Sequence, residues 1–128
     1  MRYWETITDM RRDGFDIIID MTPEDMRLED SFDDGIDPDT GKPYYDISDL
    51  YAQIEAGHLE WFQLRARAFF EGHEFGSAVI GGMLYETDKI NDIFSDGVAE
   101  DAIHMALEEA RAELVRINAR LTETDMML

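Results

Sequence analysis

The clearest hydrophobic pattern in the chain is an alternation in its middle part. From residue 62 to residue 70 every second position is apolar, and this set is Phe62, Leu64, Ala66, Ala68 and Phe70. Successive side chains of a strand point to opposite faces, so the alternation predicts a β-strand over 59–70. Glu71-Gly72 predicts a turn and residues 73–85 a return strand. The pair Gly81-Gly82 inside this second strand indicates a bulge or a close approach by another backbone.

A different period governs the C-terminal third. From Ile103 to Leu121 apolar residues recur at steps of three and four, which keeps them on one side of a helix. Ser95 or Asp96 is a suitable N-cap. The pattern predicts a long helix over about 97–122 whose apolar stripe covers the sheet.

Shorter elements fill the N-terminal half. Tyr3, Ile7 and Met10 have helical spacing, and Thr22-Pro23 resembles an N-cap followed by the first position of a helix. The sequence therefore predicts a strand over 15–20, short helices over 3–12, 23–32 and 87–94, and a helix that begins at Asp46 or Ser48 and ends at Gly57. We expect an α+β fold in which a three-stranded antiparallel sheet (15–20, 59–70, 73–85) is packed by the C-terminal helix.

The charge changes this picture more than the composition does. The chain has 128 residues, 45% of them hydrophobic, which is enough for one folded domain over 1–128. Asp and Glu number 30 against 11 Lys and Arg, a net charge of −19. Such a chain is repelled by nucleic acid and by anionic membranes, and it has no apolar run near the ~20 residues of a spanning helix. With no secretory signal and no cysteine, we expect a cytoplasmic protein.

The acids are unevenly distributed. Residues 16–60 carry a net charge of −12 out of the total of −19. Inside this stretch, residues 33–45 contain two glycines and two prolines, which predicts an acidic loop. A surface that concentrates these acids approaches the charge density of a DNA duplex and attracts proteins whose basic grooves hold nucleic acid. The alternative is an acidic protein that is merely soluble.

Motifs for catalysis or metal binding are missing from the sequence. The loop around Asp34 and Asp37 superficially resembles a calcium loop, but the twelfth positions, Tyr45 and Ser48, cannot supply the required carboxylate. The three histidines lack a short ligand spacing, and there is no nucleophile elbow or phosphate-binding loop. We therefore expect no catalytic residue, no metal and no cofactor.

Arg65 and Arg67 stand on the face of their strand opposite the core positions. Two interpretations are open: the pair is neutralised by acids of the protein such as Glu74, or it contacts an anion or carboxylate of a partner. By the same alternation Trp61 would share an outward apolar patch with Tyr85. The secondary interface that these positions suggest consists of Trp61, Arg65, Arg67 and Tyr85.

Several segments resemble those of small phage and mobile-element proteins, most of them uncharacterised. They are residues 21–25 with 30–32, and residues 57–68 followed by Gly72, Gly76 and 81–85. The resemblance covers about residues 15–115. Small size and acidity are also similar to counter-defence proteins, including anti-CRISPR and antirestriction DNA mimics.

These observations lead to one functional expectation with two alternatives. We expect a non-enzymatic inhibitor that binds a nucleic-acid-handling host defence complex, in the host cytoplasm if a phage encodes it. Its carboxylates would stand in for phosphates, and the expected contacts are Asp25, Glu29, Asp30, Asp33, Asp34, Asp37 and Asp39. The alternatives are an interaction or assembly module, as monomer or dimer, and a small nucleotide-modifying enzyme.

Overall fold

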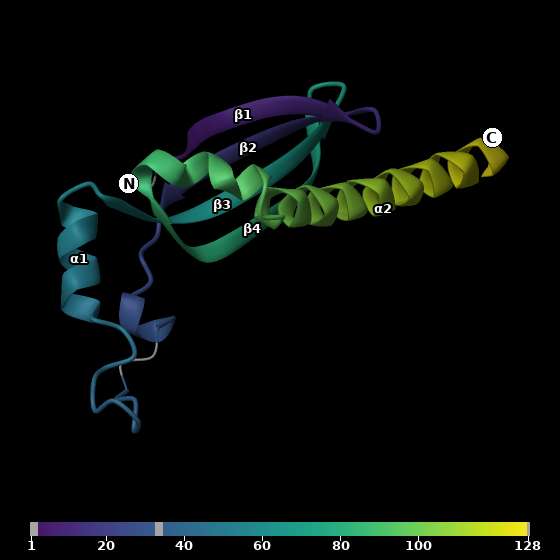
Figure 1. The fold of residues 1–128 in the computed structure, drawn as a ribbon. Coiled ribbons are helices and arrows are strands. Elements are labelled where there is room, and N and C mark those ends of the chain that lie inside the picture. The colour runs from purple at the N-terminus through teal and green to yellow at the C-terminus, as the bar shows by residue number, and fades with distance from the viewer. Residues whose placement is uncertain (1–2, 33–34, 128) are drawn as a thin grey trace.

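The computed structural model describes residues 3–32 and 35–127 and centres on a four-stranded antiparallel sheet (Figure 1). The strands lie side by side in chain order: β1 (Glu5–Arg12), β2 (Phe15–Pro23), β3 (Leu59–Phe70) and β4 (His73–Glu86). The helical segments are η1 (Leu28–Asp30), α1 (Ile47–Glu55), η2 (Thr87–Phe94) and α2 (Val98–Met127). The α+β class with an antiparallel sheet and a long C-terminal helix is confirmed, but the sheet has four strands and not three.

The additional strand is β1, where the sequence pattern indicated a helix over 3–12, and that prediction was wrong. Asp13 and Gly14 have φ angles of 55° and 87°. Two successive positive φ angles make the tight turn that joins twisted antiparallel strands, so this Asp-Gly pair closes a hairpin and does not end a helix. A register shift between Thr6 and Thr8 offsets the alternation of β1. Ile7 and Met10 consequently both pack against the core although they are three residues apart, a spacing that is also typical of one side of a helix.

The helix predicted over 23–32 is also wrong, since only the short turn η1 is helical in this stretch. The Thr22 hydroxyl, expected to cap a helix, donates a hydrogen bond to the carbonyl of Tyr3 at 2.5 Å. The Glu24 amide continues the pairing with β3 by donating to the carbonyl of Trp61 at 3.0 Å. Tertiary pairing thus satisfies the groups on which the capping signal depended.

The remaining helices follow the predictions closely. Asp46 caps α1, because its carboxylate accepts the amide of Asp49 at 3.1 Å, and α1 ends before Gly57. The helical stretch over 87–94 is present as η2. Helix α2 starts near the expected residue and continues to Met127, five residues beyond the predicted end. Among the described helices, none is both long and apolar enough to cross a bilayer.

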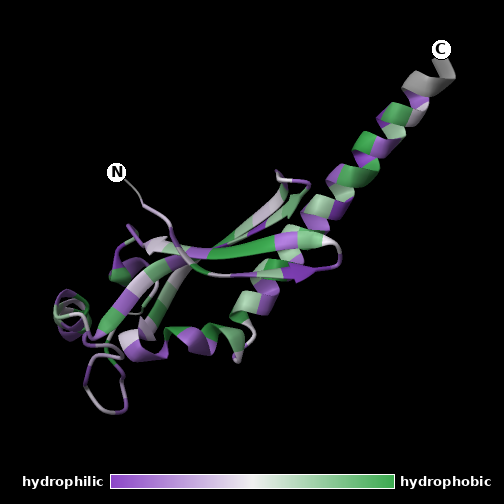
Figure 2. Ribbon diagram, turned by 90° about the horizontal axis from the view of Figure 1, so that it is seen from above, coloured by the Kyte–Doolittle hydropathy of each residue, from purple (hydrophilic) through white to green (hydrophobic). Residues whose placement is uncertain are grey.

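The core lies between the sheet and the first half of α2. Ile103, Leu107 and Ala110 of α2 are at most 2% exposed and face β3 and β4. Helix and sheet approach each other closely at Gly76, where a Cβ atom would lie 2.1 Å from the carbonyl oxygen of Ala106. The C-terminal half of the helix projects beyond the sheet (Figures 1 and 2).

The predicted bulge is present at the glycine pair of β4. Phe62 pairs with Met83, but Leu64 pairs with Ile80, so β4 has one extra residue at Gly81-Gly82. Because side chains alternate with a period of two, one inserted residue moves every later side chain of β4 to the other face. Met83 therefore faces the core, where it is 9% exposed.

Substitution of Gly76 tests the contact between α2 and the sheet. We expect Gly76→Ala to destabilise the protein by about 2–3 kcal/mol, since the new methyl group meets helix backbone that cannot turn away. Urea unfolding measures the effect. The control Ser77→Ala alters the opposite face of the same strand and should change stability by less than about 0.5 kcal/mol. An unchanged unfolding midpoint for Gly76→Ala would contradict the packing described.

Candidate partner-binding surface

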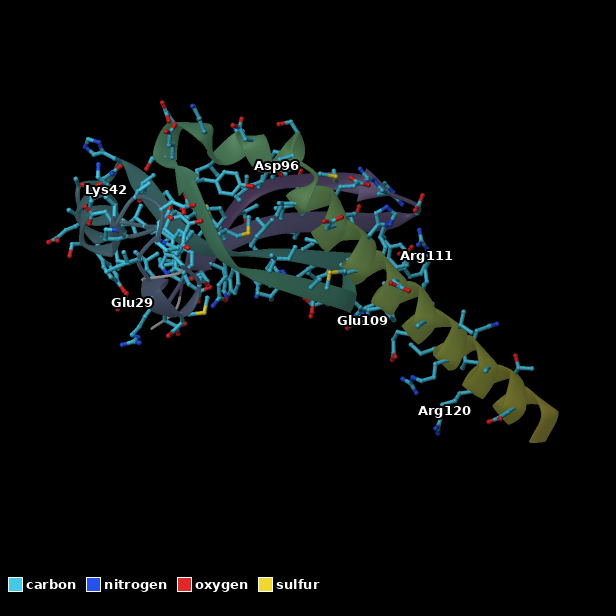
Figure 3. The ribbon with its side chains drawn as sticks, turned by 60° about the horizontal axis from the view of Figure 1, so that its bottom comes forward. Glu29, Lys42, Asp96, Glu109, Arg111 and Arg120 are labelled. Carbon is cyan, nitrogen blue, oxygen red and sulfur yellow. The ribbon has the colours of Figure 1, made fainter. Side chains whose placement is uncertain are left out.

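The connection from β2 to β3 leaves the sheet and forms an acidic arm, which we define as residues 24–58 (Figure 1). It contains η1, α1 and a turn closed by a β-bridge between Ile36 and Pro43. Its sequence has eleven carboxylates and two bases, a net charge of −9. Figure 3 shows Glu29 and Lys42 in this arm, at the opposite end of the molecule from Arg120. Nearly half of the net charge is thus gathered at one end.

Glu24 accepts four hydrogen bonds, and two of them, from Gln63 of β3 and Gly82 of β4, attach the arm to the sheet. Its Oε1 accepts the side-chain amide of Gln63 at 2.9 Å and the backbone amides of the two residues that follow it. Its Oε2 accepts the backbone amide of Gly82 at 2.8 Å. Partial burial acts against ionisation of this carboxyl group. The hydrogen bonds outweigh that effect and lower the pKa of Glu24.

A second attachment is built from aromatic residues. The Trp61 indole N–H donates to the carbonyl of Met26 at 2.8 Å, and Leu28 of η1 is fully buried. The Tyr51 hydroxyl of α1 accepts the amide of Leu28 at 3.1 Å and donates to Glu29 at 2.6 Å. This last hydrogen bond lowers the pKa of Glu29 and raises that of Tyr51. The described residues of the arm are therefore attached to the sheet and to one another by specific contacts.

All seven acids predicted to meet a partner belong to this arm, and the structure places five of them. Asp25 and Asp39 are exposed. Glu29 binds Tyr51, Asp30 lies 3.4 Å from Arg27, and Asp37 accepts the amide of Asp39 at 2.9 Å. Asp33 and Asp34 lie outside the described residues. The sequence did not single out Glu24 or Tyr51, because their roles depend on partners far away in the chain.

Ion pairs neutralise charge elsewhere in the molecule. Bases outside the arm are matched with acids in the pairs Arg12–Glu100, Arg65–Asp20, Lys89–Glu86, Arg111–Asp13 and Arg116–Glu113. The arm has two bases for eleven carboxylates, so most of its charge cannot be neutralised internally. The arm is therefore a continuous segment with a large excess of negative charge.

Arg65 and Arg67 bind an acid of the protein itself. Asp20, directly opposite Arg65 in the sheet, is 1% exposed. It accepts two hydrogen bonds from Arg65, at 2.9 and 2.7 Å, and one from Arg67 at 3.0 Å. Glu74 is a more distant neighbour, with Oε1 3.9 Å from Nε of Arg67. The geometry matches the interpretation of internal pairing, with Asp20 as the principal acid.

Trp61 and Tyr85 do not form one outward patch, because the bulge in β4 reverses the orientation of Tyr85. The Tyr85 ring packs against Phe62 of the core, with ring centroids 5.8 Å apart, and its hydroxyl donates to Asp96. Burial, with further contributions from Asp96 and Asp92, raises the pKa of Tyr85 to about 12. Trp61 is 8% exposed and lies under the arm. The four residues of the suggested secondary interface are thus divided among different environments.

The histidines are dispersed. His58 precedes β3 and His73 begins β4 after the turn, so they lie at opposite ends of the β3–β4 hairpin. An open polar cleft of about 600 Å³ beside His58 is lined also by Gln53, Glu86 and Asp88. Across residues 3–32 and 35–127, no three His, Asp or Glu side chains are arranged to hold a metal ion.

Comparison with known proteins gave no match: no family model fits the chain, and neither a curated protein nor a solved structure is significantly similar to it.

The lowered pKa of Glu24 makes its contribution to stability dependent on pH. A carboxyl group with a lower pKa in the folded state stabilises the fold above its unfolded pKa, about 4.3, and this stabilisation disappears as the pH falls through the folded value. We expect Glu24→Gln to cost about 1–2 kcal/mol at neutral pH, because the charge-assisted hydrogen bonds are weakened. The difference from the wild type should shrink as the pH falls below about 4.

Urea unfolding at several pH values measures this difference. Asp39→Asn is the matched control, because it removes one charge from an exposed position of the same arm. The control should remain close to the wild type throughout. A Glu24→Gln variant that is equally stable at neutral pH would show that Glu24 does not attach the arm.

Proposed function

We propose that the protein binds a basic nucleic-acid-binding protein or complex through its acidic arm, with carboxylates in the positions of backbone phosphates. The observation that carries this proposal is the net charge of −9 on an arm of 35 residues that extends from one end of the sheet. The remaining 93 residues carry −10. The net charge per residue of the arm is therefore more than twice that of the rest.

Averaged over the whole surface, the acids are too sparse to resemble DNA. The proposal therefore depends on the local concentration of acids in the arm. The accessible area is 8643 Å², so 30 acids average about 290 Å² each. A duplex treated as a cylinder of about 10 Å radius presents one charge per ~110 Å². A basic groove would recognise a cluster of carboxylates on the arm, where two bases compete with eleven acids.

The attachment of the arm supports the same function. Glu24 and Trp61 fix its first residues to β3 and β4, and Tyr51 holds α1 against η1. An ordered arm loses less conformational entropy when it binds than a flexible acidic tail does. Its field also accelerates encounter with a positively charged partner. Within this proposal, the specific partner is a host defence complex of the kind that anti-CRISPR and antirestriction proteins inhibit.

Charge reversal in the arm tests the proposal. The variant Asp25→Lys/Asp30→Lys/Asp39→Lys should lose binding to its partner, because three carboxylates become cations. The control Asp92→Lys/Glu108→Lys/Glu109→Lys changes the net charge by the same amount at exposed positions outside the arm. It should retain binding. Each immobilised protein is exposed to a bacterial lysate, and captured proteins are identified by mass spectrometry.

The captured complex is then challenged with salt and with duplex DNA. We expect release by both, since the contacts are electrostatic and occupy a nucleic-acid groove. Retention of the partner by the arm variant, or a complex that survives high salt and excess duplex, would exclude DNA mimicry.

A further inference from the structure

The second half of α2 projects beyond the sheet (Figures 1 and 2). Its base is still attached to the body, because Arg111 pairs with Asp13 of the β1–β2 turn and Leu114 packs at the edge of the core. From Val115 to Met127 the helix continues for about 20 Å at 1.5 Å per residue. A helical segment of this length is marginally stable in water unless one side of it is packed. Packing against another surface would therefore stabilise this segment.

The apolar stripe of α2 continues along the projecting half. Leu107 and Ala110 are buried against the sheet, Leu114 and Ile117 are partly exposed, and Leu121 is 60% exposed. The spacing of three and four residues keeps them on one side of the helix. Beyond the end of the sheet, this side presents apolar area of the kind that packs against another helix.

The projecting segment carries no net charge that would oppose association with a second copy. Residues 112–123 contain two acids and two bases and are neutral, whereas the whole chain carries −19. Glu113 and Arg120 are seven residues apart, two helical turns, and therefore lie on the same flank of the stripe. A second helix that runs in the opposite direction would bring Arg120 of one chain beside Glu113 of the other.

We propose that the projecting halves of two copies of this chain pair antiparallel around a twofold axis near Ile117. Leu114 of each copy then lies beside Leu121 of the other, and the contact between Glu113 and Arg120 occurs twice. The antiparallel direction places the two acidic bodies at opposite ends of the dimer, whereas a parallel pair would hold them side by side against their repulsion. Both acidic arms remain exposed in this arrangement.

Sedimentation equilibrium over about 10 to 500 μM protein measures the association. The wild type should show a monomer–dimer equilibrium. Ile117→Gln/Leu121→Gln should weaken the dimer by at least about a hundredfold, because four apolar side chains per dimer are replaced. Glutamine is a good helix former, so the helix itself should persist in circular dichroism.

Val115→Gln is the matched control. Val115 is 70% exposed, more than Leu121, but lies outside the stripe. Its replacement removes exposed apolar area from the same helix and should leave the dissociation constant within about twofold of the wild type. If Val115→Gln weakened the dimer as much as Ile117→Gln/Leu121→Gln does, the proposed contact through the apolar stripe would be contradicted.

Exchange of charges tests the direction of pairing. Glu113→Arg alone and Arg120→Glu alone place like charges together at both contacts of a homodimer, so each variant should associate more weakly than the wild type. When the two variants are mixed, the two substituted positions face each other at one contact, with their charges exchanged. At the second contact the unsubstituted Arg120 of one chain faces the unsubstituted Glu113 of the other. The mixture should therefore form heterodimers about as tightly as the wild type forms its dimer.

The mixture also controls for the ion pair between Glu113 and Arg116 within one helix, which Glu113→Arg removes in every combination. Heterodimers no stronger than either homodimer would overturn the antiparallel arrangement, and a wild type that stays monomeric at the highest concentration would overturn the dimer.

The arm variant Asp25→Lys/Asp30→Lys/Asp39→Lys should dimerise at least as well as the wild type, so this test is independent of the proposed function.

Discussion

The close contact between α2 and the sheet determines the arrangement of the other elements. Small residues on both sides make it, with Ala66, Ala68, Gly76 and Ala78 in the strands and Ala99, Ala102, Ala106 and Ala110 in the helix. Small side chains allow the helix axis to approach the strands closely, and backbone atoms of α2 occupy the space directly above Gly76. Since the first half of α2 covers the core, the second half extends beyond it.

The same contact leaves the other end of the sheet for the acidic arm. The arm is attached by polar groups instead of a second hydrophobic core, chiefly by the carboxylate of Glu24, and by Trp61 and Tyr51. A partly buried carboxylate is stable there because each of its oxygens accepts hydrogen bonds. The arm can consequently carry a high density of exposed acids without weakening the core. The buried carboxylate of Asp20, on the face of the sheet opposite the core, is neutralised by Arg65 and Arg67. Folding and proposed binding thus depend on different parts of the charge.

The acidic arm and the projecting half of α2 suit two different kinds of interaction. The arm combines strong negative charge with exposed apolar side chains such as Ile36 and Tyr44, whereas the projecting half of α2 has no net charge and continues the apolar stripe of the helix. Long-range attraction to a basic partner belongs to the first, and short-range packing with a second copy to the second. In the proposed dimer, two arms at opposite ends would offer two sites to a repetitive or symmetric partner.

Elements with local signals can be predicted from the amino-acid sequence alone. The alternation in β3, the three- and four-residue steps of α2, the Glu71-Gly72 turn and the bulge at Gly81-Gly82 follow from side-chain periodicity and backbone freedom, and they were predicted correctly. The net charge and its concentration in residues 16–60 also needed no coordinates.

Tertiary structure decided the features for which local signals were ambiguous. Residues 3–12 have helical spacing, yet pairing with β2 through the Asp13-Gly14 turn makes them a strand. Thr22 and Glu24 have the chemistry of a helix start, but distant partners in the sheet take up their hydrogen bonds. The orientation of Tyr85 and the attachment of the arm were likewise decided by register and by contacts between residues far apart in the chain. The physical reason is that the free energy of a hydrogen bond or a buried side chain depends on the groups that surround it after folding, and a short window of sequence does not contain those groups.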